Sequence, residues 1–146
     1  MDNINAFAER LRELMEINGE SVKTLSAKTG ISDSCYYEYL SDLHVPSYEN
    51  ALKISEFFLC PLDFLFGFCE DFKPTRKAVV SDIKTRLKAA IDESGKSRYL
   101  LSKESGIEQS QLLRWYHGDK TPTLVSLVAL RKVLDCSLDF LAGREE

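Results

Sequence analysis

The sequence predicts an all-α protein made of two copies of one compact five-helix unit. Apolar residues recur at a helical period in short segments, and residues typical of helix starts and stops, such as Ser, Thr and Gly, bound these segments. The segments also match one another at a constant offset of 76 residues without a gap, as in Leu25-Ser26 against Leu101-Ser102. Such self-similarity indicates an internal duplication.

The duplication sets the expected domain organisation. Matching residues run from Arg10-Leu11 against Arg86-Leu87 to the segment LDFLFG at 62–67 against LDFLAG at 138–143. We therefore expect a first domain over residues 1–68, a linker over 69–80 and a second domain over 81–146. Pro74 lies in the linker and breaks any continuous helix there.

The first unit is expected to begin with a helix that ends before Gly19, because Ile4, Phe7, Leu11, Leu14 and Ile17 keep a helical period. Small polar residues and Pro61 mark the starts of the later helices, and glycines mark stops. These signals predict a helix over 22–29 capped by Ser21, a helix to about residue 40 capped by Ser32 or Asp33, a helix through 57 capped by Ser47, and a short helix near Pro61 that ends before Gly67.

The second unit repeats this plan. The same signals predict a helix over about 81–93 that stops at Gly95, a helix to 105 capped by Ser97, a helix over 109–117, a helix to 134 capped by Thr123, and a short helix over 138–142.

The composition limits the functional classes. Of the 146 residues, 44% are hydrophobic and 29% are charged, as in an ordinary soluble globular protein. No apolar run approaches the ~20 residues of a membrane span, and the amphipathic, acidic N-terminus does not resemble a signal peptide. We therefore expect a cytoplasmic protein without a membrane contact.

Cofactor and enzyme chemistry find little support in the sequence. The four cysteines form no CxxC pair and have no regular histidine spacing, so we expect neither a metal site nor a redox motif. No nucleophile motif, paired catalytic carboxylates or phosphate-binding Gly-rich loop is present, and we expect no catalytic residues and no cofactor. Because the two units cover nearly the whole of this sequence, we expect no small-molecule effector domain within it.

Charge is unevenly distributed along the chain, although the net charge is -4. Residues 1–68 carry 5 Lys and Arg against 11 Asp and Glu, whereas residues 72–144 carry 14 against 8. A surface for nucleic acid, if there is one, is therefore expected in the second half.

The segment 109–117 has two chemically different faces. The polar side chains of Gln109, Ser110, Gln111 and Arg114 lie mostly on one side, and Leu112 and Trp115 lie on the other. Amide and guanidinium groups can make paired hydrogen bonds to base edges in a major groove. Taken alone, the segment also fits an ordinary amphipathic surface helix.

Each unit resembles the lambda-repressor-like, Cro-type helix-turn-helix domain of the XRE family. The matching features are the capped second helix with its Leu-Ser pair, the Gly-Ile turn, a short third helix, a Pro followed by Ser or Thr, and the closing LDFL-x-G segment. The two copies together cover nearly the whole chain. The resemblance implies that the third helix of each unit is a recognition helix that enters the major groove.

The resemblance also implies roles for residues of the second unit. Gln109, Ser110 and Arg114, with Gln111 close by, would read bases. Leu101, Ile107, Leu112 and Trp115 would be core. The residues expected to meet DNA phosphate are Lys96, Ser97, Arg98, Lys103 and Lys120.

The first unit differs at the same positions. Asp33, Ser34 and Glu38 replace Gln109, Ser110 and Arg114, and His44 replaces Lys120. Carboxylates are repelled by phosphate, although an acidic residue can accept a hydrogen bond from cytosine. These equivalents are therefore expected to bind DNA more weakly.

Three tyrosines lie on the same helix of the first unit, Tyr36, Tyr37 and Tyr39, and we expect two of them to be buried or half-buried. Both units also depart from the family, with Leu40 and Tyr116 where a Glu is common. Asp42 replaces the loop glycine, and Asp tolerates the left-handed conformation expected there.

Two functions follow from this interpretation. The first is a sequence-specific regulator that binds double-stranded DNA, a small repressor of prophage or mobile-element type, with the second unit providing most of the affinity. The second is a protein-interaction module, antitoxin-like or antirepressor-like, in which the acidic, Tyr-rich first unit binds a protein partner or a second copy. An enzyme is the least supported class.

Overall fold

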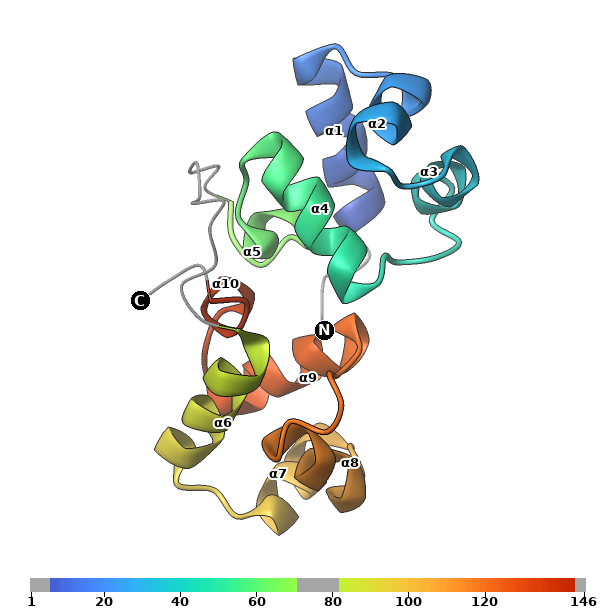
Figure 1. The fold of residues 1–146 in the computed structure, drawn as a ribbon. Coiled ribbons are helices and arrows are strands. Elements are labelled where there is room, and N and C mark those ends of the chain that lie inside the picture. The colour runs from blue at the N-terminus through green and yellow to red at the C-terminus, as the bar shows by residue number, and fades with distance from the viewer. Residues whose placement is uncertain (1–5, 71–81, 144–146) are drawn as a thin grey trace. The chain divides into compact units, whose positions relative to one another are not determined.

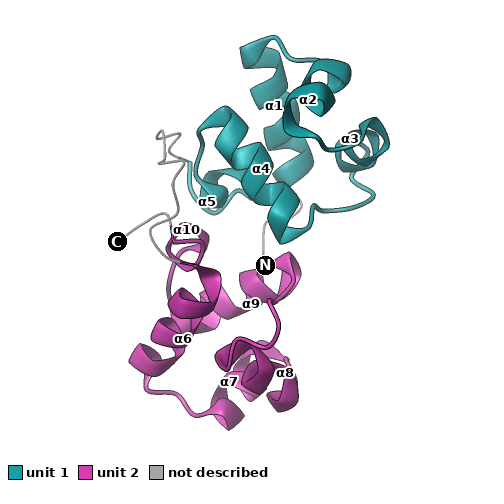
Figure 2. Cartoon of the chain, viewed as in Figure 1, with its two compact units in different colours: residues 1–76 teal, residues 77–146 magenta. Residues whose placement is uncertain are grey.

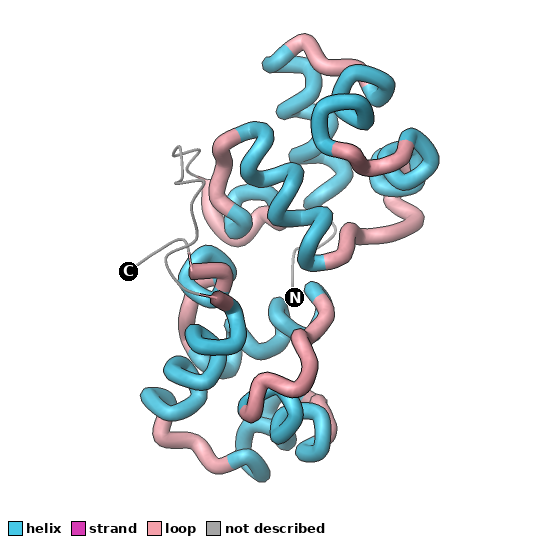
Figure 3. Tube along the Cα trace, viewed as in Figure 1, coloured by secondary structure: helices cyan, strands magenta, loops and turns pink. Residues whose placement is uncertain are grey.

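The computed structural model describes residues 6–70 and 82–143, and within them it contains helices and loops but no strand (Figure 3). The chain divides into two compact units, residues 1–76 and 77–146 (Figure 2). The expected all-α, duplicated fold is thus confirmed. The expected boundaries at 68 and 81 stay predictions, because residues 71–80 of the expected linker lie outside the described residues, as do Ile4 and Ser81.

Each unit contains five helices in the described residues (Figure 1). The helices of unit 1 are α1 (Phe7–Asn18), α2 (Val22–Thr29), α3 (Asp33–Leu40), α4 (Tyr48–Phe58) and α5 (Leu62–Leu65). The helices of unit 2 are α6 (Ile83–Ser94), α7 (Arg98–Ser105), α8 (Gln109–Tyr116), α9 (Leu124–Leu134) and α10 (Leu138–Leu141). Within a unit the first helix packs against the third and the fifth, so the third helix rests on the first helix.

Hydrogen bonds at the caps explain most of the helix boundaries. The side chains of Ser21, Ser47, Ser97 and Thr123 each accept a hydrogen bond from a backbone N–H in the first turn of the helix that follows. Of the two candidates for α3, the cap is Ser32, which accepts from the backbone N–H of Cys35.

Several helix ends differ from the sequence prediction by one or two residues. Helix α4 ends at Phe58 rather than at 57, and α6 covers Ile83–Ser94 rather than about 81–93. Pro61 is the N-cap of α5 rather than a residue of its first turn. His117 and Ala142, expected as the last residues of their helices, are instead C-caps of α8 and α10. Differences of one or two residues are common at helix ends.

The core of each unit forms where its apolar helix faces meet. The largest fully buried side chains of unit 1 are Phe7, Leu11, Leu25, Tyr36, Ile54, Leu62, Leu65 and Phe66. Those of unit 2 are Leu87, Leu101, Leu112 and Leu127. Each core also carries a guanidinium over an aromatic ring, Arg10 at 4.2 Å from the Phe64 centroid and Arg86 at 4.7 Å from the Phe140 centroid.

Two apolar residues were predicted incorrectly. Ile17 is 80% exposed, because Met15 continues the buried face of α1 and Ile17 lies beyond the edge of that face. Ile107 is half-buried, whereas its counterpart Ile31 is fully buried. Asp42 has the expected left-handed conformation, with a φ of 60°.

We predict that Gly106→Ala lowers the free energy of unfolding of unit 2 by about 1 kcal/mol, because Gly106 has a φ of 77° that a Cβ disfavours. An added Cβ would meet no atom within 4 Å, so backbone strain is the whole effect. Urea denaturation of the full chain measures it. Gly106→Asn is the matched control and should lose less, because Asn tolerates this conformation; equal losses for both variants would refute the strain argument.

Candidate nucleic-acid interface

The turn between α7 and α8 is held by side-chain hydroxyls. Ser102 Oγ donates a hydrogen bond to the Ile107 carbonyl at 2.5 Å. Ser105 Oγ donates to the Leu101 carbonyl at 2.6 Å and accepts from the Ile107 N–H at 3.2 Å. These contacts give the N–H and the carbonyl of Ile107 side-chain partners, and they fix the direction in which α8 leaves the turn.

Unit 1 repeats these contacts. Ser26 Oγ donates to the Ile31 carbonyl at 2.5 Å, and Thr29 Oγ1 donates to the Leu25 carbonyl at 2.8 Å. Sequence reasoning identified the Leu-Ser pair and the Gly-Ile turn as motifs but did not predict this bonding. The signal for it was present in the sequence, because in both units a serine stands five residues before the isoleucine of the turn.

Helix α8, the expected recognition helix, separates its two faces as predicted. Leu112 and Trp115 are buried, whereas Gln109, Ser110 and Arg114 are exposed and Gln111 is half-buried. Among the described residues, the side chains of Gln109, Ser110 and Arg114 make no hydrogen bond to the protein. Their donors and acceptors are therefore available to an external ligand.

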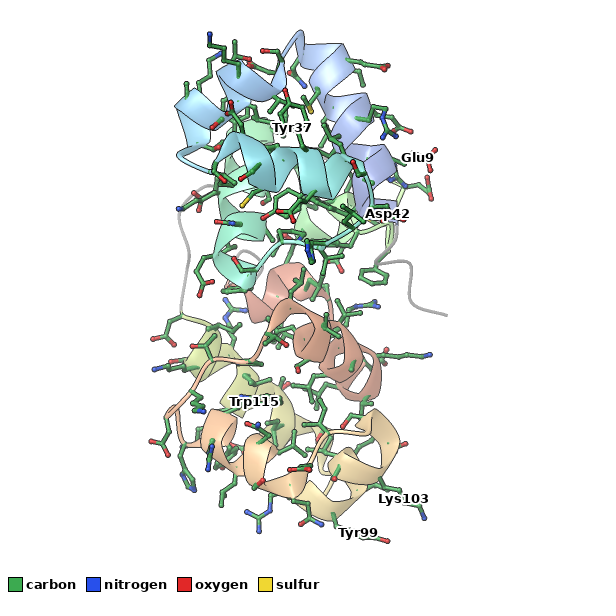
Figure 4. The ribbon with its side chains drawn as sticks, turned by 90° about the vertical axis from the view of Figure 1, so that its right-hand side faces the viewer. Glu9, Tyr37, Asp42, Tyr99, Lys103 and Trp115 are labelled. Atoms are coloured by element: carbon green, nitrogen blue, oxygen red, sulfur yellow. The ribbon has the colours of Figure 1, made fainter. Side chains whose placement is uncertain are left out.

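Most of the expected phosphate contacts lie on the surface of unit 2. Arg98 and Lys103 are exposed on α7, and Lys120 is exposed in the loop after α8. Ser97 is exposed at the α7 N-terminus, where its hydroxyl accepts from the Leu100 N–H at 3.1 Å. In Figure 4 the side chain of Lys103 projects outward, whereas Trp115 lies within the unit.

Lys96 has an additional role inside the domain. Its ammonium donates to the Val133 carbonyl near the C-terminus of α9 at 3.0 Å and pairs with Glu104 at 2.9 Å. A cation at this place stabilises a helix C-terminus. An ammonium has three N–H donors, so a phosphate contact by Lys96 stays a prediction that has to use the remaining donor.

Sequence reasoning missed two features of unit 2. Tyr99 is 62% exposed in the first turn of α7, next to Arg98, and its hydroxyl can reach a partner there (Figure 4). Tyr116 joins α8 to α6, because its hydroxyl donates to Asp92 Oδ1 at 2.8 Å. This hydrogen bond raises the pKa of Tyr116 above its ordinary value.

The charge of the described part of unit 2 is close to balanced. Residues 82–143 carry 10 Lys and Arg against 8 Asp and Glu, so much of the excess expected for 72–144 comes from positions outside this range. Glu104, Glu108 and Asp119 lie among the expected DNA contacts. The attraction of unit 2 for a polyanion would therefore depend on where individual cations lie rather than on its net charge.

The third helix of unit 1 is acidic at its surface. Asp33 and Ser34 are exposed, and Glu38 pairs with His44 at 3.3 Å when the histidine is protonated. The expectation for the tyrosines is confirmed, since Tyr36 and Tyr39 are buried and Tyr37 is 59% exposed.

The two buried tyrosines are hydrogen-bonded. The hydroxyls of Tyr36 and Thr29 lie 2.7 Å apart, and Tyr39 accepts from Asn50 Nδ2 at 3.1 Å. Burial raises the pKa of Tyr39, and it raises the pKa of Tyr36 to about 12.

Comparison with known protein families identifies both units. The helix-turn-helix family model matches residues 11–65 and 87–141, two stretches that begin 76 residues apart. The chain belongs to this helix-turn-helix family. It is a DNA-binding regulator of the XRE type, and this type of domain is non-enzymatic. Searches among curated proteins and among solved structures found no match.

Other site types find no support in the described residues. No group of three or more His, Cys, Asp and Glu there could hold a metal ion. Within the same part of the chain, no helix is long and apolar enough to cross a membrane. The four cysteines are free thiols.

We predict that Tyr36 makes unit 1 sensitive to alkaline pH. Between pH 10 and about 12 the unfolded chain loses the phenol proton while the folded unit keeps it, so the stability that is fully present below pH 10 is lost as pH rises toward 12. The expected loss is roughly 2 to 3 kcal/mol. Urea denaturation of wild type and Tyr36→Phe at several pH values measures it, and parallel stability curves for the two proteins would contradict the prediction.

Proposed function

We propose that the protein is a sequence-specific repressor of prophage or mobile-element type, which binds double-stranded DNA mainly through unit 2. In this proposal α8 enters the major groove, where Gln109, Ser110, Gln111 and Arg114 contact base edges. Gln suits adenine and Arg suits guanine as bidentate partners. Lys96, Ser97, Arg98, Lys103 and Lys120 contact phosphate and set the register.

The observation that carries this proposal is the difference between the two recognition helices on one scaffold. In α8 the exposed amide and guanidinium groups of Gln109 and Arg114 have no partner among the described residues. In α3 the same positions are the carboxylates of Asp33 and Glu38. A polyanion attracts the first set and repels the second.

The tandem arrangement also bears on the DNA site. Helix-turn-helix proteins commonly bind as dimers to two half-sites about one helical turn apart. Two units in one chain can serve as a single-chain counterpart of such a dimer. Because α3 and α8 carry different side chains, the proposal implies an asymmetric site rather than a palindrome.

Selection of bound duplexes from a random pool tests the proposal directly. The winning duplex is titrated at two salt concentrations, because phosphate contacts release counterions and make binding steeply salt-dependent. An enriched motif with a steep salt dependence supports a sequence-specific regulator. Absence of enrichment, with weak and uniform binding, would overturn it.

We predict that replacing Gln109 and Arg114 with Ala abolishes or relaxes specific binding, since each good bidentate contact contributes ~1–3 kcal/mol of discrimination. The matched change at Asp33 and Glu38 removes charge from the same helix positions of unit 1 and should leave affinity unchanged or improve it. Fluorescence anisotropy with the selected duplex measures both. A greater loss from the unit 1 variant would reverse the roles of the units.

A second candidate is a protein-interaction module, antitoxin-like or antirepressor-like, in unit 1. The exposure of two large apolar side chains favours it, Tyr37 on α3 at 59% and Leu43 in the following loop at 68%. Both lie close in sequence to Asp33, Glu38 and Asp42. Apolar groups beside charges are a common composition for protein-binding surfaces.

If unit 1 mediates self-association, the double variant Tyr37→Ala with Leu43→Ser should weaken it. Sedimentation velocity over a range of protein concentrations measures the association. Tyr99→Ala is the control, because it removes an exposed tyrosine from unit 2 instead. A monomeric wild type, or an equal effect of both variants, would count against self-association through this surface.

A further inference from the structure

A hollow of about 370 Å³ lies where α6 meets the C-terminal end of the recognition helix α8. Its lining is mainly polar or basic and comes from Lys84, Thr85, Lys88, Tyr116, His117 and Gly118. None of these residues belongs to the expected DNA contacts. The hollow thus places cationic and hydrogen-bonding groups of a different helix beside the end of α8.

The two lysines of the hollow are available to a ligand. Lys84 and Lys88 are four residues apart on α6 and therefore share one face of the helix. Both are exposed, and neither ammonium forms a hydrogen bond or an ion pair within residues 6–70 and 82–143. The Lys88 ammonium lies 5.4 Å from the Tyr116 ring centroid, a contact that keeps it beside α8.

Gly118 shapes the opening. It has a φ of 78°, and a Cβ added there would lie 3.4 Å from Lys84 Cδ. The Lys84 stem therefore packs against the loop at ordinary van der Waals distance, and the positive φ is the reason that glycine is favoured at this position.

Three carboxylates lie near this region, and two of them have partners. Asp92 accepts the hydroxyl hydrogen bond of Tyr116 at 2.8 Å, and Asp82 accepts from the Thr85 backbone N–H at 2.8 Å. Asp119 is exposed on the loop that follows Gly118. Hydrogen bonds from Thr85, with a smaller contribution from the charge of Lys84, lower the pKa of Asp82, so the charge of Lys84 is partly compensated there. Neither ammonium forms an ion pair with the three carboxylates, which favours an anion as the ligand.

Unit 1 provides an internal comparison, because the equivalent positions there are unsuited to an anion. Ala8 and Glu9 stand where unit 2 has Lys84 and Thr85, and Asp42 stands where it has Gly118. Figure 4 labels Glu9 and Asp42 on this unit. Arg12, the counterpart of Lys88, donates to the Leu40 carbonyl at 2.9 Å.

We propose that the hollow of unit 2 binds a backbone phosphate of duplex DNA, with Lys84 and Lys88 providing charge. The His117 imidazole can donate a directed hydrogen bond to one of its oxygens, whereas the Thr85 hydroxyl is already bonded to Asp82. This inference rests on the proposed function, because the duplex is the source of the phosphate. It extends the DNA contact from α7 and α8 to α6, and it makes the two units differ in phosphate binding as well as in base reading.

Anisotropy titrations of the selected duplex over a fourfold range of salt test this subsite. The double variant Lys84→Ala with Lys88→Ala should flatten the slope of log affinity against log salt by about 0.9, because the contact to one phosphate is lost. When salt is raised over that range, the affinity of wild type should therefore fall by a factor roughly three to four times larger than the affinity of the variant. The base motif should stay the same, because phosphate contacts carry no sequence information.

The control variant, Lys53→Ala with Lys132→Ala, removes two exposed lysines from α4 and α9 and keeps the net charge matched. A slope change equal to that of the control would overturn the proposal. Both substitutions on α6 place good helix formers at exposed sites, so circular dichroism should show a folded protein.

Two further arms separate the alternatives. Titration with inorganic phosphate, followed by the NMR signals of unit 2, tests a free anion as the ligand; saturation in wild type combined with an unchanged DNA salt slope in the variant would overturn a DNA source. The Gln109 and Arg114 variant separates this proposal from the proposed function. If the Gln109 and Arg114 variant loses specificity while the Lys84 and Lys88 variant has the same salt slope as the Lys53 and Lys132 control, only the phosphate subsite is refuted. If no duplex is enriched in the selection, the proposed function itself is refuted.

Discussion

The fixed turn between the second and third helices is the constraint on which the rest of each unit depends. A recognition helix can present a defined set of side chains only if its direction is set by the scaffold. Gly106 supplies the left-handed residue that ends α7, and the Ser102 hydroxyl holds the Ile107 carbonyl at 2.5 Å. Gly30 and Ser26 do the same in unit 1. The two units therefore present different surface side chains on third helices whose turns have the same geometry.

The sequence predicted this scaffold well because its signals are local. Caps such as Ser21 and Ser97, and the glycine stops, act within one helical turn. Features that depend on tertiary packing were not predictable in the same way. Ile17 has the right spacing but lies beyond the buried face, and the Lys96 ammonium reaches the end of a helix 37 residues later in the chain. The Tyr116–Asp92 bond likewise joins residues that no local pattern connects.

The divergence of the two units follows from which positions the fold requires. Tyr36 and Leu112 occupy equivalent positions of the two units and are both fully buried. A core position can therefore change the size of its side chain when the neighbouring side chains also change. Asp33 and Gln109 are exposed, and surface substitutions of this kind usually change stability by less than about 0.5 kcal/mol. A duplicated unit can therefore acquire a new surface chemistry without losing its fold.

The contact between the first and third helices differs between the two units, and this difference determines whether a cation of the first helix is available to a ligand. In unit 1 the guanidinium of Arg12 holds the end of α3 by donating to the Leu40 carbonyl. In unit 2 the neutral hydroxyl of Tyr116 and the Asp92 carboxylate make the equivalent connection, so the ammonium of Lys88 is not needed for it. One unit thus uses its cation for its own fold, and the other keeps its cation at the surface. For that reason the groups that a unit has available for a ligand depend on its internal contacts as well as on the side chains of its third helix.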